Sequence, residues 1–227
     1  MYPLIPEFMW PYTVWVFFIG FVLFSIAIIY RLWSAIKRFR LRSGLYNAYH
    51  DLVCAIGYCY GAGLFLKFSG FGPDWLRWWL GDFGFPVALA LIFMSRVEAK
   101  YTKNETSLSY AEWIIDRIMY IKTALRMLVV TYLLSVGYEV MCGVINMIGE
   151  RNGVTLTDFG IGGFDPVDVL MYSLGAGLAA FIWLKSLKLL QRERVYVTER
   201  EAQLEKQKRE QRAKAGTGAR KYAKKRR

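Results

Sequence analysis

Three carboxylates in this sequence are placed where a membrane protein could use them for binding. Glu139 stands late in one long apolar stretch, and Asp165 and Asp168 end a short polar segment directly before another. If both stretches cross a bilayer as a hairpin, the three side chains gather at one end of it. An acidic group within a lipid-spanning segment is costly and marks a site or a buried polar contact. Such a cluster could bind a cation, donate a proton or hold a polar lipid headgroup, with Arg151 as a nearby base.

The same residues also have a purely structural interpretation. Asp165, Pro166 and Asp168 form a helix start, with aspartate at the N-cap, proline at the first helical position and an acid in the first turn. Small residues then recur at positions that allow close helix contact, namely Ser173, Gly175, Gly177 and Ala179. The sequence therefore leaves two interpretations of this hairpin open, a binding site and a packing device.

A second polar pair, His50 and Asp51, lies at the start of an earlier apolar stretch. One interpretation places both side chains at the cytoplasmic interface, paired with the nearby arginines. The other is a proton relay, which would need a second acidic partner that this stretch does not contain. We favour the interfacial pairing.

These polar groups must be positioned by membrane-spanning helices. The chain has 227 residues, of which 55% are hydrophobic and 17% aromatic, which is too apolar for an ordinary soluble domain. The apolar residues come in blocks of about 20, the length of a helix that crosses a bilayer. The sequence predicts an all-α bundle of about five transmembrane helices, with spans near residues 12–33, 45–66, 83–94, 124–148 and 167–184. The third of these is the shortest, and a tryptophan-rich stretch extends it backward.

Basic residues predict the orientation of these helices. They are concentrated after the first span and between the third and fourth spans, whereas the other two connections hold only Lys67, Arg77 and Arg151. The positive-inside rule then puts the N-terminus outside and the C-terminal tail inside. It also places an amphipathic surface helix, residues 107–122, on the inner side and the carboxylates toward the outer face.

Few residues could support metal, redox or hydrolytic chemistry. The three cysteines, Cys54, Cys59 and Cys142, fall inside apolar stretches without a CxxC pair, and the chain has one histidine. The sequence contains no G-x-S-x-G motif and no phosphate-binding loop, and His50 is expected on the opposite side of the membrane from the carboxylates. The sequence favours a non-enzymatic protein, and we expect no metal and no cofactor.

The charge of the chain is concentrated in its tail. Of the net charge of +12, residues 185–227 supply +11, from 16 Lys or Arg and five Glu. We divide the chain into a transmembrane domain, residues 1–190, and a basic cytoplasmic tail, residues 191–227. The tail is expected to begin as a helix, to break at Ala213–Gly218 and to be disordered beyond that point. Five basic residues near its end could contact anionic lipid or nucleic acid, namely Lys221, Lys224, Lys225, Arg226 and Arg227.

The hairpin also resembles part of a known family. Tyr138-Glu139, a polar loop, and Phe164-Asp165-x-x-Asp168 leading to Leu174-Gly175-Ala176 resemble the C-terminal half of VanZ-like membrane proteins. The family pattern is matched at Glu139, Asp165, Asp168 and Gly175, whereas Cys142 stands at its Gln and Tyr172 at its Asn. VanZ-like proteins are small multi-span envelope proteins, best known for low-level teicoplanin resistance. The resemblance implies an integral protein of a bacterial-type inner membrane that binds a lipid headgroup or a lipid-linked envelope precursor at its outer face.

Two other functions stay open beside this one. The chain could be a non-enzymatic structural or accessory subunit of a membrane protein complex, or a homo-oligomer, with the tryptophan-rich loop at 69–84 and the tail as docking surfaces. It could also be a tether that binds nucleic acid or ribosomes through residues 198–227. Co-purification at fixed stoichiometry would favour the first, and binding that weakens steeply with salt would favour the second. Anionic membrane lipids are expected partners.

Overall fold

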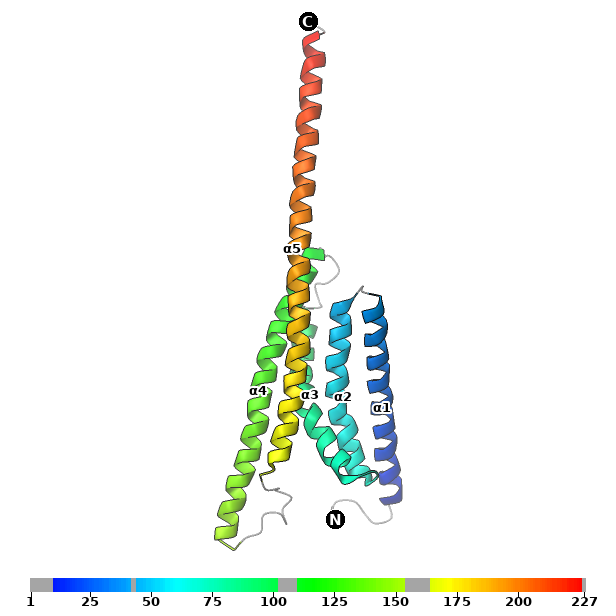
Figure 1. The fold of residues 1–227 in the computed structure, drawn as a ribbon, viewed down its shortest axis with the longest axis vertical. Helices are drawn as coiled ribbons and strands as arrows, with labels where there is room; N and C mark the ends of the chain where they lie inside the picture. The colour runs from blue at the N-terminus through cyan, green and yellow to red at the C-terminus, as the bar shows by residue number, and fades with distance from the viewer. Residues whose placement is uncertain (1–9, 42–43, 102–109, 154–163, 226–227) are drawn as a thin grey trace.

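The computed structural model describes residues 10–41, 44–101, 110–153 and 164–225. These residues form helices and no strand, in the order α1 (Trp10–Arg40), α2 (Leu45–Ser69), α3 (Asp74–Tyr101), α4 (Tyr110–Arg151) and α5 (Pro166–Lys225) (Figure 1). Each of these five described helices is long and apolar enough to cross a membrane. The all-α class and the five long apolar helices expected of a multi-pass membrane protein are therefore confirmed. The orientation of the bundle in a membrane stays a prediction.

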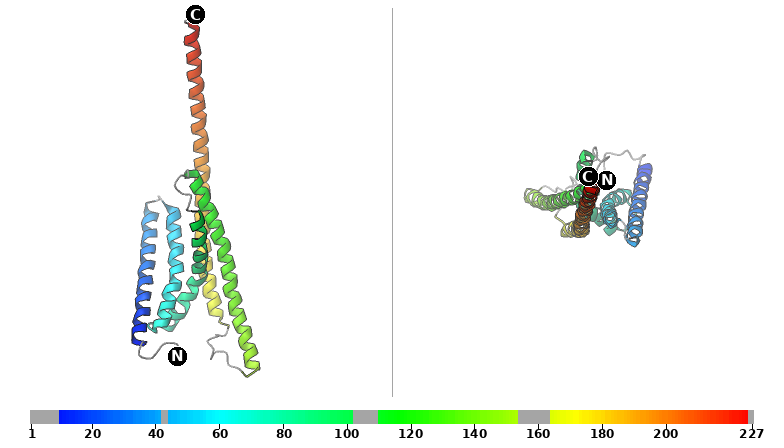
Figure 2. Two further views of the ribbon diagram at one scale, coloured as in Figure 1. Left: turned by 180° about the vertical axis from the view of Figure 1, so that it is seen from behind. Right: turned by 90° about the horizontal axis from the view of Figure 1, so that it is seen from above.

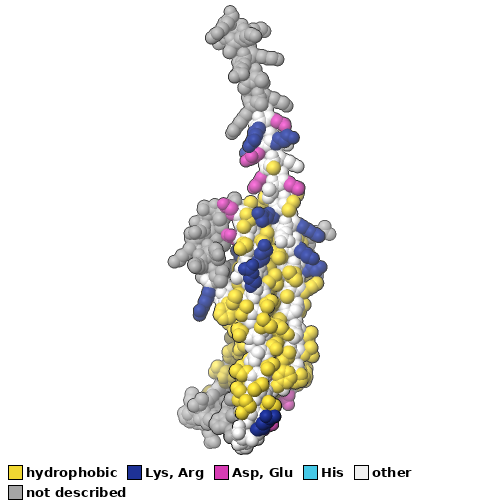
Figure 3. All heavy atoms as spheres, turned by 90° about the vertical axis from the view of Figure 1, so that its left-hand side faces the viewer, with side chains coloured by type: hydrophobic (Ala, Val, Ile, Leu, Met, Phe, Trp, Pro, Cys, Tyr) yellow, Lys and Arg dark blue, Asp and Glu magenta, His cyan; other side chains and the backbone are white. Residues whose placement is uncertain are grey.

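Helices α2, α3 and α5 contact one another and form the centre of the bundle (Figure 2). Helix α4 packs against α3 and α5, whereas α1 packs against α2 alone among the described helices. The central helices and α4 share one apolar core, which includes Val53, Val87, Met94, Ile121 and Trp183. Figure 3 shows hydrophobic side chains over one face of the bundle, with Lys and Arg gathered mainly toward the end from which α5 projects. Such an apolar surface suits helices that face lipid.

Two glycines let the central helices approach closely near one end of the bundle. A methyl group at Gly175 would overlap the carbonyl oxygen of Phe83, so α5 touches the backbone of α3 there. A methyl group at Gly84 would overlap the backbone nitrogen of Tyr60, so α3 touches α2 in the same way. The predicted contact role of Gly175 is confirmed. The prediction for Gly177 is wrong, because this residue lies on the exposed face of α5 and a methyl group there would meet nothing within 4 Å.

Helix α3 contains Pro86 and bends along its length (Figure 1). Because proline has no N–H, the backbone carbonyl of Asp82, one turn earlier, lacks its usual helical partner. Thr131 of α4 donates its hydroxyl to the carbonyl oxygen of Pro86 at 3.1 Å, which ties α4 to α3 at the bend. The part of α3 that carries Asp82 therefore runs at an angle to the rest of the helix.

Each described helix extends beyond the span that the sequence predicts, and for α3 the predicted backward extension by the tryptophan-rich stretch is confirmed. Helix α3 starts at Asp74, and the carbonyl of Pro73 accepts hydrogen bonds from two N–H groups of its first turn, so the tryptophan-rich stretch belongs to the helix. The surface helix expected at 107–122 and the fourth span form one helix from Tyr110, since no proline separates them. Residues 107–109 lie outside the described residues.

Helix α5 runs for 60 residues and projects far beyond the bundle (Figure 1). The break expected at Ala213–Gly218 is not seen in the described backbone. Two glycines cost a helix about 1 kcal/mol each relative to Ala, which the Ala, Lys and Arg residues around them offset. Of the five basic residues predicted to contact polyanions, Lys221, Lys224 and Lys225 lie on α5, and Arg226 and Arg227 lie outside the described residues. The domain boundary at residue 190 stays a prediction.

Candidate functional site

The structure brings four carboxylates together at the end of the bundle opposite the projecting part of α5. Glu139 comes from α4, Asp165 directly precedes α5, and Asp168 lies in its first turn. Asp82 of α3, to which the sequence alone did not point, joins them. Electrostatic interactions connect the four side chains, which we call the carboxylate cluster. The predicted gathering of Glu139, Asp165 and Asp168 at one end of the hairpin is therefore seen.

Tyr172 of α5 links the cluster across three helices. Its phenol oxygen is 3.1 Å from Oε1 of Glu139 and 3.4 Å from Oδ1 of Asp82. A phenol has one proton to donate, so Tyr172 serves one of these carboxylates at a time. Both Tyr172 and Glu139 are buried. The position at which the VanZ-like pattern has Asn therefore holds a side chain that bridges two acids of the cluster.

Asp165 has a structural role in the cluster. Its Oδ1 accepts the backbone N–H of Val167 at 2.8 Å, and Pro166 is the first residue of α5, so the predicted helix start is confirmed. The backbone N–H of Asp165 also donates to the carboxylate of Glu139. Asp168, by contrast, has its carboxyl group within hydrogen-bonding reach of Asp82. Asp82, Asp165 and Asp168 line cavities at this end of the bundle, whereas Glu139 is buried, so the three aspartates are the acids of the cluster that another molecule could contact.

The basic group that faces the cluster is Lys67 of α2. It interacts electrostatically with Asp82 and Asp168, and its ammonium group lies 4.0 Å from the ring centroid of Trp78. Arg151, which the sequence suggested as the partner, is exposed at the end of α4. Among the described residues no hydrogen bond or ion pair joins Arg151 to the cluster. One lysine beside four carboxylates leaves this end of the bundle acidic.

A cavity of about 340 Å³ opens beside the cluster. Its polar wall includes the carboxyl group of Asp82, and its apolar wall includes Leu89 and Leu134. Leu134 is exposed on the apolar surface of α4, so the cavity opens toward the region where lipid is expected. The complete lining consists of Tyr60, Asp82, Phe85, Leu89, Leu134, Ser135, Tyr138 and Tyr172. A cavity with an acid at one wall and hydrocarbon at the other fits an amphipathic molecule.

A second cavity, of about 360 Å³, lies where α3 and α5 begin. Its lining combines acids and tryptophans, namely Asp74, Trp75, Trp78, Trp79, Asp165 and Asp168. Exposed tryptophans at helix ends are typical of a membrane interface. Their ring faces also attract ammonium groups, as the position of Lys67 over Trp78 illustrates. Asp168 lines this cavity and interacts with Asp82 of the first one, so the acids lie between the two cavities.

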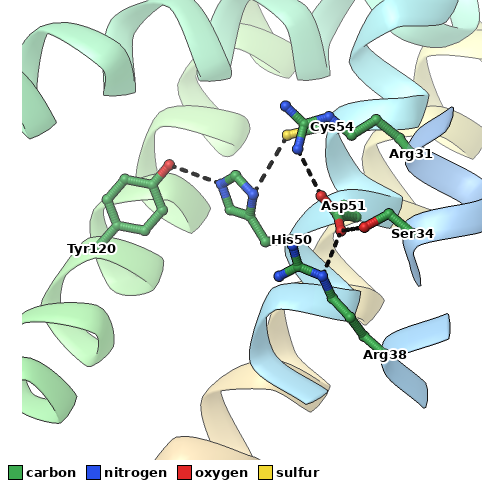
Figure 4. A network of polar contacts seen from close by, with 7 residues as sticks. All are labelled: Arg31, Ser34, Arg38, His50, Asp51, Cys54 and Tyr120. Atoms are coloured by element: carbon green, nitrogen blue, oxygen red, sulfur yellow. Dashed lines mark hydrogen bonds and ion pairs between the residues drawn. The ribbon is translucent and has the colours of Figure 1, made fainter. Parts of the chain in front are cut away.

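Asp51, one of the polar pair predicted at the start of the second span, ties α1 to α2 (Figure 4). Asp51 is 3% exposed. Its Oδ1 accepts a hydrogen bond from Nη1 of Arg31 at 2.7 Å, and its Oδ2 accepts one from Oγ of Ser34 at 2.8 Å. Nε of Arg38 lies 3.4 Å from Oδ2, the oxygen that also accepts the Ser34 hydroxyl. All three partners belong to α1, so the expected pairing with the preceding arginines is seen for Asp51.

His50 points away from Asp51 and toward α4 (Figure 4). Its Nε2 is 3.4 Å from the hydroxyl of Tyr120, and its Nδ1 is 3.5 Å from Sγ of Cys54. The two members of the predicted pair therefore serve different contacts. One fixes α1 and the other bridges α2 to α4, which gives both residues a structural role.

Three residues of the site escape sequence reasoning, and each carries a local signal. Asp82 directly precedes the predicted third span. An acid next to an apolar span is the same kind of signal that singles out Glu139. Tyr172 lies four residues after Asp168 and so shares its helix face. Lys67 ends the predicted second span. What the sequence lacks is any indication that these three residues meet.

Within the described residues, no group of three His, Cys, Asp or Glu side chains is arranged to hold a metal ion. Comparison with known proteins gives no match to this chain among protein-family models, curated proteins or solved structures. The VanZ-like resemblance is therefore untested and stays a prediction.

Proposed function

We propose that this protein binds a lipid, with the polar headgroup at the carboxylate cluster and the hydrocarbon in the cavity beside it. The observation that carries the proposal is the 340 Å³ cavity itself. Its wall holds a carboxyl group and a buried phenol from Asp82 and Tyr172, and it opens past Leu134 on the apolar side of the bundle. A headgroup and the first part of an acyl or polyprenyl chain would meet matching surfaces there.

The chemistry of the site selects among headgroups. Asp82 and Asp168 line the two cavities and supply hydrogen-bond acceptors and negative charge, so they favour a headgroup with amine or hydroxyl donors. The tryptophan faces of the second cavity favour an ammonium group as well. Lys67 adds one positive charge beside these acids, which suits a headgroup that also carries a phosphate. The preferred ligand is therefore a lipid with a donor-rich or zwitterionic headgroup.

The proposal agrees with the function that the VanZ-like resemblance implies. In that interpretation the cluster lies at the outer face of a bacterial-type membrane, and the ligand is an envelope lipid or a lipid-linked precursor. Two of the positions that match the family pattern belong to the site. Gly175 lies against the backbone of α3, and Glu139 accepts a hydrogen bond from Tyr172. The membrane, its sidedness and the identity of the lipid belong to the proposal.

Bound-lipid analysis after purification in mild detergent tests the proposal. The wild-type chain should retain one lipid class with an amine-bearing or polyhydroxylated headgroup, enriched over its share of the host membrane. Asp82→Asn and Tyr172→Phe should each lower that enrichment, because they remove a charge and a hydrogen-bond donor from the cavity wall. Tyr132→Phe is the matched control, since Tyr132 makes a 2.9 Å hydrogen bond to Ser173 between the same two helices outside the cavity.

The control separates loss of the site from loss of the fold. If Tyr132→Phe keeps the enriched lipid while the two cavity variants lose it, the cavity is the binding site. Retention of lipid by all three variants would place the lipid elsewhere and refute the proposal. A wild-type chain whose lipids simply mirror the host membrane would refute it as well.

A further inference from the structure

The positive charge of the tail is divided into two zones by a neutral segment. Residues 185–192 carry three basic residues and no acid. Residues 193–211 carry five Glu and five Lys or Arg, so their net charge is zero. Residues 212–227 carry eight Lys or Arg and no acid. We call 193–211 the neutral stalk and 212–227 the basic tip.

The neutral stalk continues α5 beyond the bundle, and only its first residues, up to Val197, still pack against the core. Every residue from Thr198 to Gln211 is exposed, and Glu205 pairs with Arg209 one turn later at 3.7 Å. At its base, Tyr110 of α4 donates a hydrogen bond to Glu193. The stalk is therefore fixed to the bundle at one end and projects freely from it (Figure 1). At a rise of 1.5 Å per residue, its 19 residues span about 28 Å.

This length decides whether the basic tip meets the membrane surface. The first basic zone follows the apolar part of α5 directly and is well placed to contact headgroups. The tip begins about 28 Å farther along the helix, whereas the potential of an anionic membrane decays over a Debye length of about 8 Å. The tip is thus more than three Debye lengths away, so lipid attraction does not account for its charge.

We propose that the basic tip binds nucleic acid in the aqueous phase and holds it at a distance from the membrane. Six of the eight positive charges lie on the 14 residues of α5 from 212 to 225, which gives on average one charge per about 3.5 Å along the axis. This spacing is close to the about 3.4 Å between phosphates of one strand. The basic residues form two groups, 212–214 and 220–227, with no acid in either, and so match a polyanion such as a phosphate backbone better than a protein surface of mixed charge. The proposal is independent of lipid binding at the carboxylate cluster.

The test measures binding of a labelled 30-base-pair RNA or DNA duplex to the full chain in nanodiscs of zwitterionic lipid. Binding is followed by fluorescence anisotropy from 50 to 300 mM NaCl. With five or more phosphates neutralised, log Kobs should fall against log[salt] with a slope of about −4 or steeper. A variant with Gln at five tip positions should bind at least about 100-fold more weakly at 100 mM salt and show a slope shallower by about 4. The five positions are Lys221, Lys224, Lys225, Arg226 and Arg227.

A matched variant in the stalk removes four charges without changing the net charge. It combines Glu205→Gln, Lys206→Gln, Arg209→Gln and Glu210→Gln, and its affinity should stay within about threefold of the wild type because these groups balance one another. Equal losses in the stalk and tip variants would overturn the assignment to the tip. A salt slope shallower than about −1 for the wild type would exclude phosphate contacts altogether.

Nanodiscs with anionic lipid test the distance itself. If the stalk holds the tip away from the surface, replacing a third of the zwitterionic lipid by anionic lipid should change duplex affinity by less than threefold. A loss of tenfold or more would mean that the tip lies on the headgroups, and that result would replace nucleic acid by lipid as its partner.

Discussion

Replacing Gly175 by alanine tests whether the contact of α5 with α3 holds the site together. The added methyl group would overlap the carbonyl oxygen of Phe83, and ordinary contact begins only near 3.4 Å. A backbone carbonyl cannot rotate away as a side chain can, so α5 would have to move from α3 by about 1 Å or more. Overpacking of this kind costs about 1 to 3 kcal/mol, and a clash with backbone on both helices belongs at the upper end.

Gly177→Ala is the matched control for this substitution. The same change is made two residues later on the same helix, where a methyl group meets nothing within 4 Å. Alanine is favoured over glycine in a helix interior by about 1 kcal/mol, so this variant should be slightly more stable than the wild type. Because both variants replace a helical glycine by alanine, this gain cancels between them, and they should differ in unfolding free energy by the overpacking cost, about 2 to 3 kcal/mol. Titration with SDS in mild detergent, followed by circular dichroism, measures the difference.

The Gly175 substitution should also weaken the site. Tyr172 lies one turn before Gly175, so a retreat of α5 lengthens the 3.4 Å contact between Tyr172 and Asp82. We expect lipid enrichment to fall in Gly175→Ala and to persist in Gly177→Ala. Equal stability of the two variants would show that α5 does not touch α3 at Gly175, and the geometry of the cluster would then have to be revised.

Three other substitutions test the ties between helices. Asp51→Asn should lower the unfolding free energy by about 2 to 3 kcal/mol, less than for a fully buried pair, because the Arg31 and Arg38 side chains are 33% and 42% exposed and can reach water. Arg38→Gln should cost below about 1 kcal/mol, and a cost equal to that of Asp51→Asn would contradict this ranking. Thr131→Val should cost about 1 kcal/mol through loss of the hydrogen bond to Pro86, and an unchanged SDS midpoint would show that this bond contributes nothing.

The helices of this protein are predictable because their signal is local. A span is recognised by about 20 consecutive apolar residues, which needs no knowledge of neighbours. At the start of α3 this signal gives the extension by the tryptophan-rich stretch but no exact boundary, because Asp74, Arg77 and Gly81 lower the apolar content there. The approach fails between 107–122 and the fourth span, because a change from amphipathic to apolar composition does not by itself interrupt a helix.

The site is predictable only in part because it depends on how helices cross. Asp165 and Asp168 lie together by sequence, and the hairpin brings Glu139 near them. Asp82 joins through the approach of α3 to α5, and that approach is possible because Gly175 has no side chain. The sequence offers Gly175 and Gly177 as equal candidates for this contact, and only the rotation of α5 about its axis distinguishes them.

The two interpretations of the hairpin, packing device and binding site, are compatible, because some of its residues serve packing and others line the proposed binding site. Asp165 caps α5 with its side chain and steadies Glu139 with its backbone N–H, so its acid is used within the fold. Gly175 sets the distance between α5 and α3. These packing contacts hold Tyr172 between Glu139 and Asp82 at the wall of a cavity that opens on the apolar surface. Asp82 is the acid at the wall of that cavity, so it is the side chain to replace first.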